Sequence, residues 1–178
     1  QADMFASSDD TDNTTKAVGT VPDNYLTVLD EAAFNSMLQQ LRRCELVAFD
    51  TETTSVDANH CELVGMSFSI KAGEGYYVPV PADQTEAQAI VDEFKPLLEN
   101  PKIGKIGQNI KYDILVMKWY GVSVQGELFD TMLAHYLLDP ESKHNMDVLS
   151  ENYLGYTPVS ITELIGKKGK DQGTMRDV

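Results

Sequence analysis

A short apolar run that ends in two carboxylates constrains the fold of this chain most. The run is Leu46-Val47-Ala48-Phe49, and Asp50-Thr51-Glu52 follows it directly. An apolar run of this length without alternation is typical of a strand buried on both faces, which needs covering layers on both sides of its sheet. We therefore expect a layered α/β protein with this strand near the middle of the sheet.

Residues 25–178 alternate between strand-like and helix-like apolar patterns. Two strand patterns, at 63–70 and 76–80, flank the turn 71–75 and predict an antiparallel hairpin. One more strand is expected at 103–106. The fold class expected from this order is α/β, with a mixed central sheet flanked by helices. Helical spacing predicts helices over 33–41, 87–98 with a kink or restart at Pro96, 110–120, 129–137, 146–154 and 161–165.

The first 24 residues have a different composition from the rest of the chain. Thirteen of these 24 residues are Ser, Thr, Asp or Asn, and apolar residues are sparse. Such a segment buries too little apolar surface to offset the entropy of ordering it. We therefore expect a flexible acidic linker over residues 1–24, a boundary near Pro22, and one domain over 25–178.

Charge and cysteine content exclude several classes of protein. The chain carries 28 Asp and Glu against 14 Lys and Arg, a formal net charge of −14. This balance argues against a broad basic face for duplex DNA and against attachment to an anionic membrane surface. No apolar run approaches the ~18 residues of a spanning helix. With two cysteines and three histidines that lack metal-ligand spacing, neither a disulfide scaffold nor a zinc site is expected.

Asp50 and Glu52 are the first candidate site. Side chains alternate along a strand, so these two carboxylates point to the same side and lie close together. Adjacent carboxylates repel each other at neutral pH, and a divalent cation such as Mg²⁺, which prefers hard oxygen ligands, would compensate them. The alternative is a strand that ends in solvent with ordinary polar residues at its mouth.

The second candidate is the segment Gly107-Gln108-Asn109-Ile110-Lys111-Tyr112-Asp113, which runs from a predicted strand into a predicted helix. Asn109 is expected to cap that helix, which leaves Asp113 in its first turn, facing the carboxyl ends of the strands. The alternative is that Asp113 is there only because the helix dipole favours an acidic residue in the first turn.

Together these segments resemble the 3′–5′ proofreading exonuclease domains of bacterial DNA polymerase I, which is a family A polymerase. Residues 47–53, Val47-Ala48-Phe49-Asp50-Thr51-Glu52-Thr53, resemble the first exonuclease motif of that family, and residues 107–113 resemble the second. The similarity covers nearly all of the chain from Asn24 onward. It extends through Leu63-Val64-Gly65-Met66-Ser67-Phe68, Phe129-Asp130-Thr131-Met132-Leu133 and Gly166-Lys167-Lys168-Gly169-Lys170, and Asp3-Met4-Phe5 resembles the segment that precedes the domain.

This resemblance implies a ribonuclease-H-like fold and two-metal hydrolysis of the 3′-terminal phosphodiester of single-stranded or frayed DNA, which releases nucleoside monophosphates. Asp50 would bridge both metals, Glu52 would hold the metal that activates water, and Asp113 would serve the second metal through water. The implied cofactors are two divalent cations, Mg²⁺ with Mn²⁺ or Zn²⁺ as substitutes.

The resemblance also implies a set of substrate-binding residues. Gln108 and Asn109 would contact the terminal nucleotide or its phosphate, with Thr51 and Tyr112 beside them. Val56 and Ile161 fall near the apolar positions that wedge between the last bases, although the family often has a larger residue where Ile161 stands.

One family motif is missing from the sequence. The third exonuclease motif is a Tyr followed four residues later by an Asp, whereas Tyr153 is followed at that spacing by Thr157. The chain ends at Val178, about where the helix with this motif would begin. We therefore expect the C-terminal helix to be absent and the native chain to continue into a polymerase domain. The 178 residues alone should be weakly active or inactive. The sheet surface that the helix would cover is a candidate contact for a dimer.

Two functional interpretations remain open beside the proofreading exonuclease. The chain could be a non-catalytic structural module of a family A polymerase, since some members keep the fold while losing metal ligands. It could also be an RNA-processing exonuclease of the same superfamily. The expected partners are a single-stranded 3′ DNA end and the polymerase domain of the same chain, in the cytoplasm of a bacterium, with no membrane.

Overall fold

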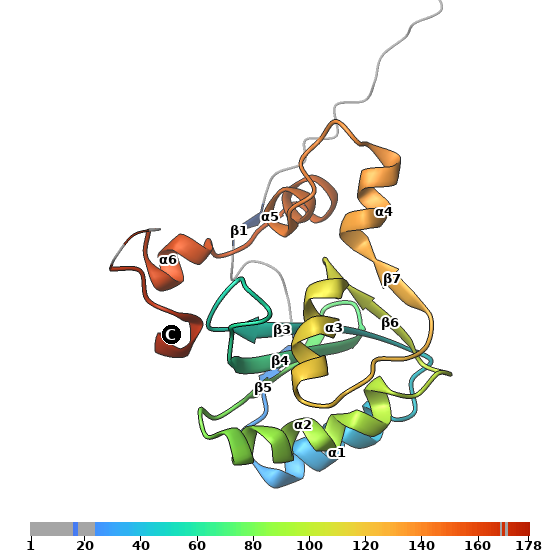
Figure 1. Ribbon diagram of the computed structural model, residues 1–178. Coiled ribbons are helices and arrows are strands. Elements are labelled where there is room, and N and C mark those ends of the chain that lie inside the picture. Colours follow the sequence, from blue (N-terminus) through green and yellow to red (C-terminus); the bar gives the residue numbers. More distant parts are fainter. Residues whose placement is uncertain (1–15, 18–23, 168, 170) are drawn as a thin grey trace, which may run out of the picture.

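A six-stranded mixed sheet forms the centre of the molecule (Figure 1). The computed structural model describes residues 16–17, 24–167, 169 and 171–178. The strand order is β2-β5-β4-β3-β6-β7, in which β4 is antiparallel to both β3 and β5 and the other pairs are parallel. The strands are β2 Asn24–Thr27, β3 Leu46–Thr53, β4 Leu63–Lys71, β5 Glu74–Pro79, β6 Gly104–Gly107 and β7 Leu128–Asp130, and a separate pair joins β1 Lys16–Ala17 to β8 Tyr156–Thr157.

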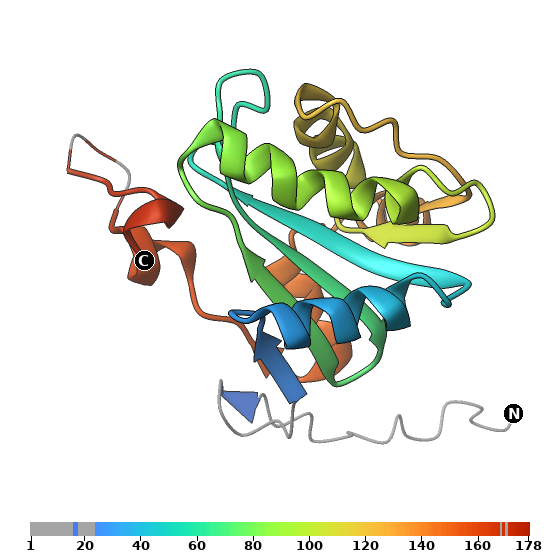
Figure 2. The ribbon, with the colours of Figure 1, turned by 90° about the horizontal axis from the view of Figure 1, so that it is seen from below.

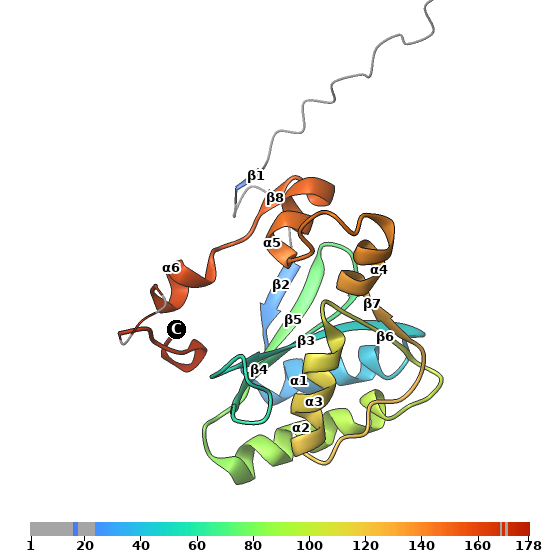
Figure 3. The same cartoon turned by 45° about the horizontal axis from the view of Figure 1, so that its top comes forward.

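Helices flank this sheet, which confirms the predicted fold class. Figure 2 shows α1 and α2 side by side over one face of the sheet, and Figure 3 shows α4 and α5 on the opposite side. The helices are α1 Glu31–Leu41, α2 Gln84–Leu98, α3 Ile110–Trp119, α4 Thr131–Leu138, α5 Met146–Leu149 and α6 Ile161–Ile165, with a π-helical turn η1 at Ser150–Leu154 and a 3-10 turn η2 at Met175–Asp177.

The hydrophobic core lies between the sheet and helices α1, α2 and α3. Val47 and Phe49 of β3 are buried in it, and Phe68 of β4 stacks on Phe94 of α2 with ring centroids 4.6 Å apart. The expectation that the run 46–49 is buried on both faces is wrong, because Leu46 is 49% exposed. The second face of β3 instead lines an open cavity of about 510 Å³.

Two of the differences between the predicted and the observed elements have a clear physical cause. Helix α2 continues through Pro96, because a proline in the last turn removes a single backbone hydrogen bond while Leu97 and Leu98 stay buried beyond it. The predicted helix from Phe129 begins at Thr131, because Phe129 pairs with Ile106 in the parallel ladder of β6 and β7.

Most of the predicted linker, including Asp3-Met4-Phe5, lies outside the described residues. Of residues 1–24, the structure describes Lys16 and Ala17 in β1 and Asn24 at the start of β2. Within the part of the chain that is described, no helix has the length and apolar character that crossing a membrane requires.

Candidate active site

Two carboxylates extend from the end of β3 to the open face of the sheet. Asp50 and Glu52 alternate with the buried Thr51, so both point away from the core, and Asp50 lines the cavity. Burial, followed by the charges of Asp113 and Glu52, raises the pKa of Asp50 to about 7. The pKa of Glu52 is also raised, by burial and then by Asp113. The end of β3 therefore carries two acidic side chains whose pKa values are raised and whose charges no neighbouring cation compensates among the residues that the structure describes.

Asp113 joins this site from the first turn of α3. It is 2% exposed, and its Oδ1 accepts hydrogen bonds from Thr51 N at 2.8 Å and from Thr51 Oγ1 at 2.6 Å. Burial raises the pKa of Asp113 to about 6, although the two bonds from Thr51 act in the opposite direction. The first-turn position alone does not explain these contacts, so the third carboxylate is held against the strand that carries the other two.

The turn between β6 and α3 has an unusual backbone. Asn109 has φ 59° and ψ 42°, and it is the one non-glycine residue with positive φ in the described part of the chain. It occupies the N-cap position of α3, as predicted, but its side chain makes no capping hydrogen bond. A capping residue that bonds through its side chain usually has an extended backbone, whereas that of Asn109 is left-handed. The Asn109 amide donates to Asp130 Oδ1 at 3.1 Å.

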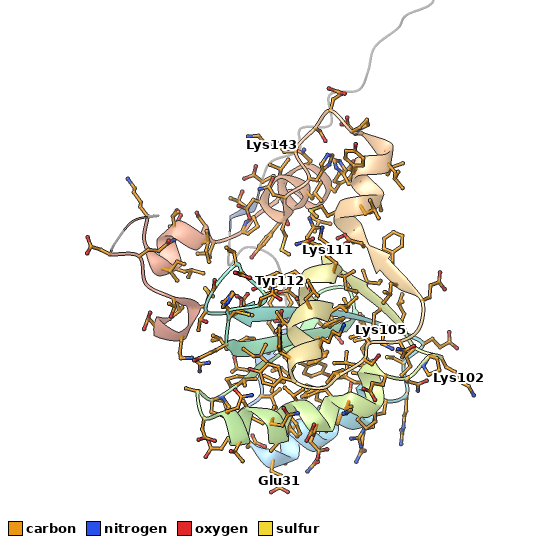
Figure 4. The ribbon with its side chains drawn as sticks, in the orientation of Figure 1. Glu31, Lys102, Lys105, Lys111, Tyr112 and Lys143 are labelled. Carbon is orange, nitrogen blue, oxygen red and sulfur yellow. The ribbon has the colours of Figure 1, made fainter. Side chains whose placement is uncertain are left out.

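Two of the predicted substrate-binding residues use their polar groups within the protein. Gln108 Nε2 donates to the His144 carbonyl at 2.7 Å, and its Oε1 accepts from Thr131 Oγ1. Tyr112 points from the start of α3 toward the loop after β3 (Figure 4), where its hydroxyl donates to the Ser55 carbonyl at 2.5 Å. Burial is the main reason that the pKa of Tyr112 rises to about 12.

The remaining predicted contacts lie at different depths. Val56, in the loop after β3, is 96% exposed, and Ile161, at the start of α6, is 49% exposed. Both apolar side chains are therefore accessible to a ligand. Thr51 is 7% exposed and donates to Asp113 through both its amide and its hydroxyl. It therefore orients a carboxylate and is not placed to contact a nucleotide through its side chain.

Sequence reasoning missed two groups of residues at this end of the sheet. His135 and His144, which have no metal-ligand spacing, lie with their Nδ1 atoms 2.7 Å apart. Tyr77 of β5 lies over Gly65 of β4, the residue that pairs with Glu52 across the sheet. Neither contact follows from spacing, because each depends on how distant segments approach one another.

The donor set fits a divalent cation, although it does not form a preformed cage. Among the described residues, no three His, Cys, Asp or Glu side chains are arranged to hold a metal ion. Asp113 is turned toward Thr51 instead. No described Lys or Arg forms an ion pair with Asp50, Glu52 or Asp113, so three mutually repelling oxygen donors remain without a protein cation. Hard carboxylate oxygens are the ligands that Mg²⁺ prefers.

Solved structures with this architecture define a class of nuclease folds. The Nibbler EXO domain of Aedes aegypti has a TM-score of 0.61 at 14% identity, over 86% of this chain and 78% of that one. Brucella melitensis NrnC with bound Mg²⁺ has a TM-score of 0.57 at 19% identity, over 77% of this chain and 63% of that one. The fold is that of the ribonuclease-H-like exonucleases.

Sequence relatives identify the family. The profile of the family described as 3′-5′ exonuclease matches residues 25–176. DNA polymerase I of Pseudomonas aeruginosa is 42% identical over 156 residues, which are 83% of this chain and 17% of that protein. DNA polymerase I of Borreliella burgdorferi is 36% identical over 147 residues, 80% of this chain and 16% of that protein. The chain belongs to the 3′-5′ exonuclease domain family of DNA polymerase I. It spans about a sixth of the length of these polymerases.

Proposed function

We propose that residues 25–178 are a proofreading domain that removes the 3′-terminal nucleotide from single-stranded or frayed DNA, with residues 1–24 as a linker. The observation that carries this proposal is the convergence of Asp50, Glu52 and Asp113 at the end of β3, where Asp50 lines an open cavity. Family membership supplies the direction of digestion, and the three carboxylates supply the means of phosphodiester hydrolysis.

The chemistry needs two divalent cations, Mg²⁺ or its substitutes Mn²⁺ and Zn²⁺. When bound, such ions supply a hydroxide nucleophile and stabilise the leaving 3′-oxygen. Asp50, Glu52 and Asp113 would hold these ions: Asp50 would serve both, Glu52 the ion that activates water, and Asp113 the other. In this chain, Thr51 keeps Asp113 oriented by two hydrogen bonds. The cavity that Asp50 lines would give the terminal nucleotide access to this carboxylate.

The proposed contacts with the substrate depend on which of the predicted side chains are exposed and which already bond to the protein. Val56 and Ile161 are exposed and would wedge against the last bases. Gln108, Asn109 and Tyr112 would line the path of the terminal nucleotide. Because the hydroxyl of Tyr112 and the amide group of Gln108 already bond to the protein, they would shape this path more than they read the base.

The partners follow from the relatives, which are bacterial polymerases. We place the domain in the bacterial cytoplasm, in one chain with a polymerase domain that delivers the frayed 3′ end. Dimerisation through the open sheet face stays a prediction, which sedimentation of the 178-residue chain would test.

The 178 residues alone should hydrolyse DNA weakly. None of the eight tyrosines is followed by an aspartate four residues later, so the sequence offers no counterpart to the third exonuclease motif. Without a fourth carboxylate and a tyrosine to orient the attacking water, the rate should fall by orders of magnitude, about 10²-fold or more, relative to a complete site.

A single-strand digestion assay at high protein concentration tests this function. With 5′-labelled DNA and Mg²⁺, we expect a ladder that shortens from the 3′ end, no ladder with EDTA, and no ladder for Asp50→Ala. Asp92→Ala, which removes an exposed carboxylate on α2, is the matched control and should behave as the wild type.

Two other outcomes would select the alternatives. If the chain neither digests DNA nor gains thermal stability from Mg²⁺, it is a non-catalytic module, which agrees with the absence of a preformed metal cage among the described residues. Faster digestion of RNA than of DNA would instead indicate an RNA-processing exonuclease.

A further inference from the structure

The start of α4 contacts the turn that carries the second exonuclease motif. One oxygen of Asp130, Oδ1, accepts three backbone N–H bonds: from Met132 at 2.9 Å, Leu133 at 3.2 Å and Asn109 at 3.1 Å. The first two bonds cap α4. The third reaches 21 residues back along the chain, to the turn between β6 and α3.

A second set of hydrogen bonds joins the turn between β6 and α3 to the segment that begins at β7. Thr131, the residue after Asp130, donates to Gln108 Oε1, while Gln108 Nε2 donates to the His144 carbonyl. Both residues of the turn, Gln108 through its side chain and Asn109 through its backbone, are thus tied to the segment that begins at β7. The sheet brings these segments together, because Gly107 pairs with Asp130 at the ends of β6 and β7.

The turn needs such support because its backbone is strained. A left-handed conformation at a non-glycine residue costs free energy and persists only where neighbouring groups fix it. Asn109 has this conformation, and it directs the chain from β6 into α3, whose first turn carries Asp113. A relaxed turn would rotate α3 and move Asp113 away from Thr51.

We infer that Asp130 is a positioning residue for the exonuclease site, which holds the Gln108–Asn109 turn in place through the Asn109 amide while it caps α4. The effect of Asp130 on catalysis rests on the proposed function. Its role in fixing the Gln108–Asn109 turn does not depend on that function. Asp130 acts through the turn on Asp113 and on the path of the terminal nucleotide.

The substitution Asp130→Ser separates the two roles of this side chain. Serine is a strong helix cap, so the bonds to Met132 and Leu133 are retained, but its oxygen stands one bond closer to the backbone and does not reach Asn109. Asp83→Ser is the matched control, since Asp83 caps α2 with bonds from Thr85 N and Glu86 N at 2.9 and 3.0 Å. Asp130→Asn keeps an acceptor oxygen in the same place and should rescue the contact.

We expect the Asn109 amide of the metal-free Asp130→Ser chain to exchange with solvent about tenfold faster or more, which corresponds to the loss of one hydrogen bond to a charged group. The melting temperature should fall no further than in Asp83→Ser. In the digestion assay, kcat/KM should fall by a similar factor, and both quantities should return in Asp130→Asn.

Equal Asn109 exchange in Asp130→Ser and Asp83→Ser would overturn the inference, and so would faster exchange with unchanged kcat/KM. A wild-type chain that neither digests DNA nor gains thermal stability from Mg²⁺ would refute the proposed function instead. In that case the exchange rate of Asn109 still decides whether Asp130 fixes the turn.

Discussion

The carboxylate of Asp113 accepts two hydrogen bonds from Thr51, a residue 62 positions earlier in the chain. Thr51 lies between Asp50 and Glu52 on β3, so its side chain is on the buried face of the strand while the side chains of its two neighbours are on the opposite face. Because side chains alternate along β3, the strand places the carboxylates of Asp50 and Glu52 on one side. On the other side it places the Thr51 side chain, which orients the carboxylate of Asp113.

Substituting Thr51 by valine removes the hydroxyl donor at 2.6 Å and keeps the amide donor at 2.8 Å. Since that bond stabilises the ionised carboxylate, the pKa of Asp113 should rise further in Thr51→Val. We expect kcat to fall about tenfold, as for the loss of one hydrogen bond to a charged group. NMR titration of the Asp113 side chain gives the pKa, and Thr85→Val, on the exposed start of α2, is the control. An unchanged titration curve would mean that the hydroxyl does not hold Asp113.

The raised pKa of Asp50 makes the stability of the metal-free chain depend on pH. Its folded pKa is about 7 against an ordinary value of 3.8, so the fold binds this proton more tightly than the unfolded chain does. Stability is therefore highest below about pH 4 for this group and is lost as the pH rises to 7. We expect Asp50→Asn to raise the free energy of unfolding at pH 8 by about 1–2 kcal/mol, a value reduced for partial contact with solvent.

Urea denaturation in EDTA at pH 5 and pH 8 measures this difference. Asp92→Asn, on the exposed side of α2, should leave the pH dependence as it is in the wild type. If Asp50→Asn were no more stable than the wild type at pH 8, burial of the Asp50 carboxylate beside the charges of Asp113 and Glu52 would not destabilise the fold.

Gly65 is required because a tyrosine ring lies over it. A Cβ atom at position 65 would stand 2.2 Å from the Tyr77 hydroxyl oxygen. The ring must therefore shift in Gly65→Ala, which should cost about 1–3 kcal/mol as other overpacked sites do. In a thermal-unfolding double-mutant cycle, Tyr77→Ala should relieve part of that cost. Gly169→Ala, where the nearest atom is 3.9 Å away, should cost less, and additive effects would contradict the contact.

Lys105 of β6 holds two loops together through a buried ammonium group. It is 0% exposed, and its Nζ donates to the carbonyl oxygens of Asn100, Ile103 and Gln125 at 2.7–2.8 Å. Lys105→Met would leave these acceptors buried without a donor, so we expect a loss of about 2–4 kcal/mol in urea denaturation. Lys102, also labelled in Figure 4, is exposed, and Lys102→Met should have little effect. A stable Lys105→Met chain would show that water satisfies the carbonyls.

Sequence patterns correctly predicted those features that depend on residues close together in the chain, such as helix caps, strand alternation and hairpins. Asp30 stands directly before an apolar helical pattern, and it caps α1 by accepting a hydrogen bond from Ala33 N at 2.8 Å. Strand alternation correctly placed Asp50 and Glu52 on one side of β3. The hairpin of β4 and β5 followed from two apolar runs around a short turn.

What the sequence could not show depends on contacts between distant segments. The bond from Thr51 to Asp113 and the left-handed backbone of Asn109 exist because α3 docks on β3 and β7 docks on β6. Strand β7 is three residues long, too short for any periodicity to reveal. The contact of His135 with His144 likewise needs the loop after α4 to fold back on that helix.

The mixed sheet has a consequence for the order in which the chain folds. Strands β3, β4 and β5 follow one another along the chain and pair antiparallel, whereas β6 pairs with β3 only across the 50 residues or more that separate Ala48 from Ile106. Pairing between distant segments is slower, because more chain entropy is lost before contacts form. Asp50 and Glu52 thus belong to the half that forms early, and Asp113 belongs to the half that forms late. During synthesis on the ribosome, Asp50 and Glu52 would therefore fold into place before Asp113. The three carboxylates would come together only after β6, α3 and β7 have packed on the sheet.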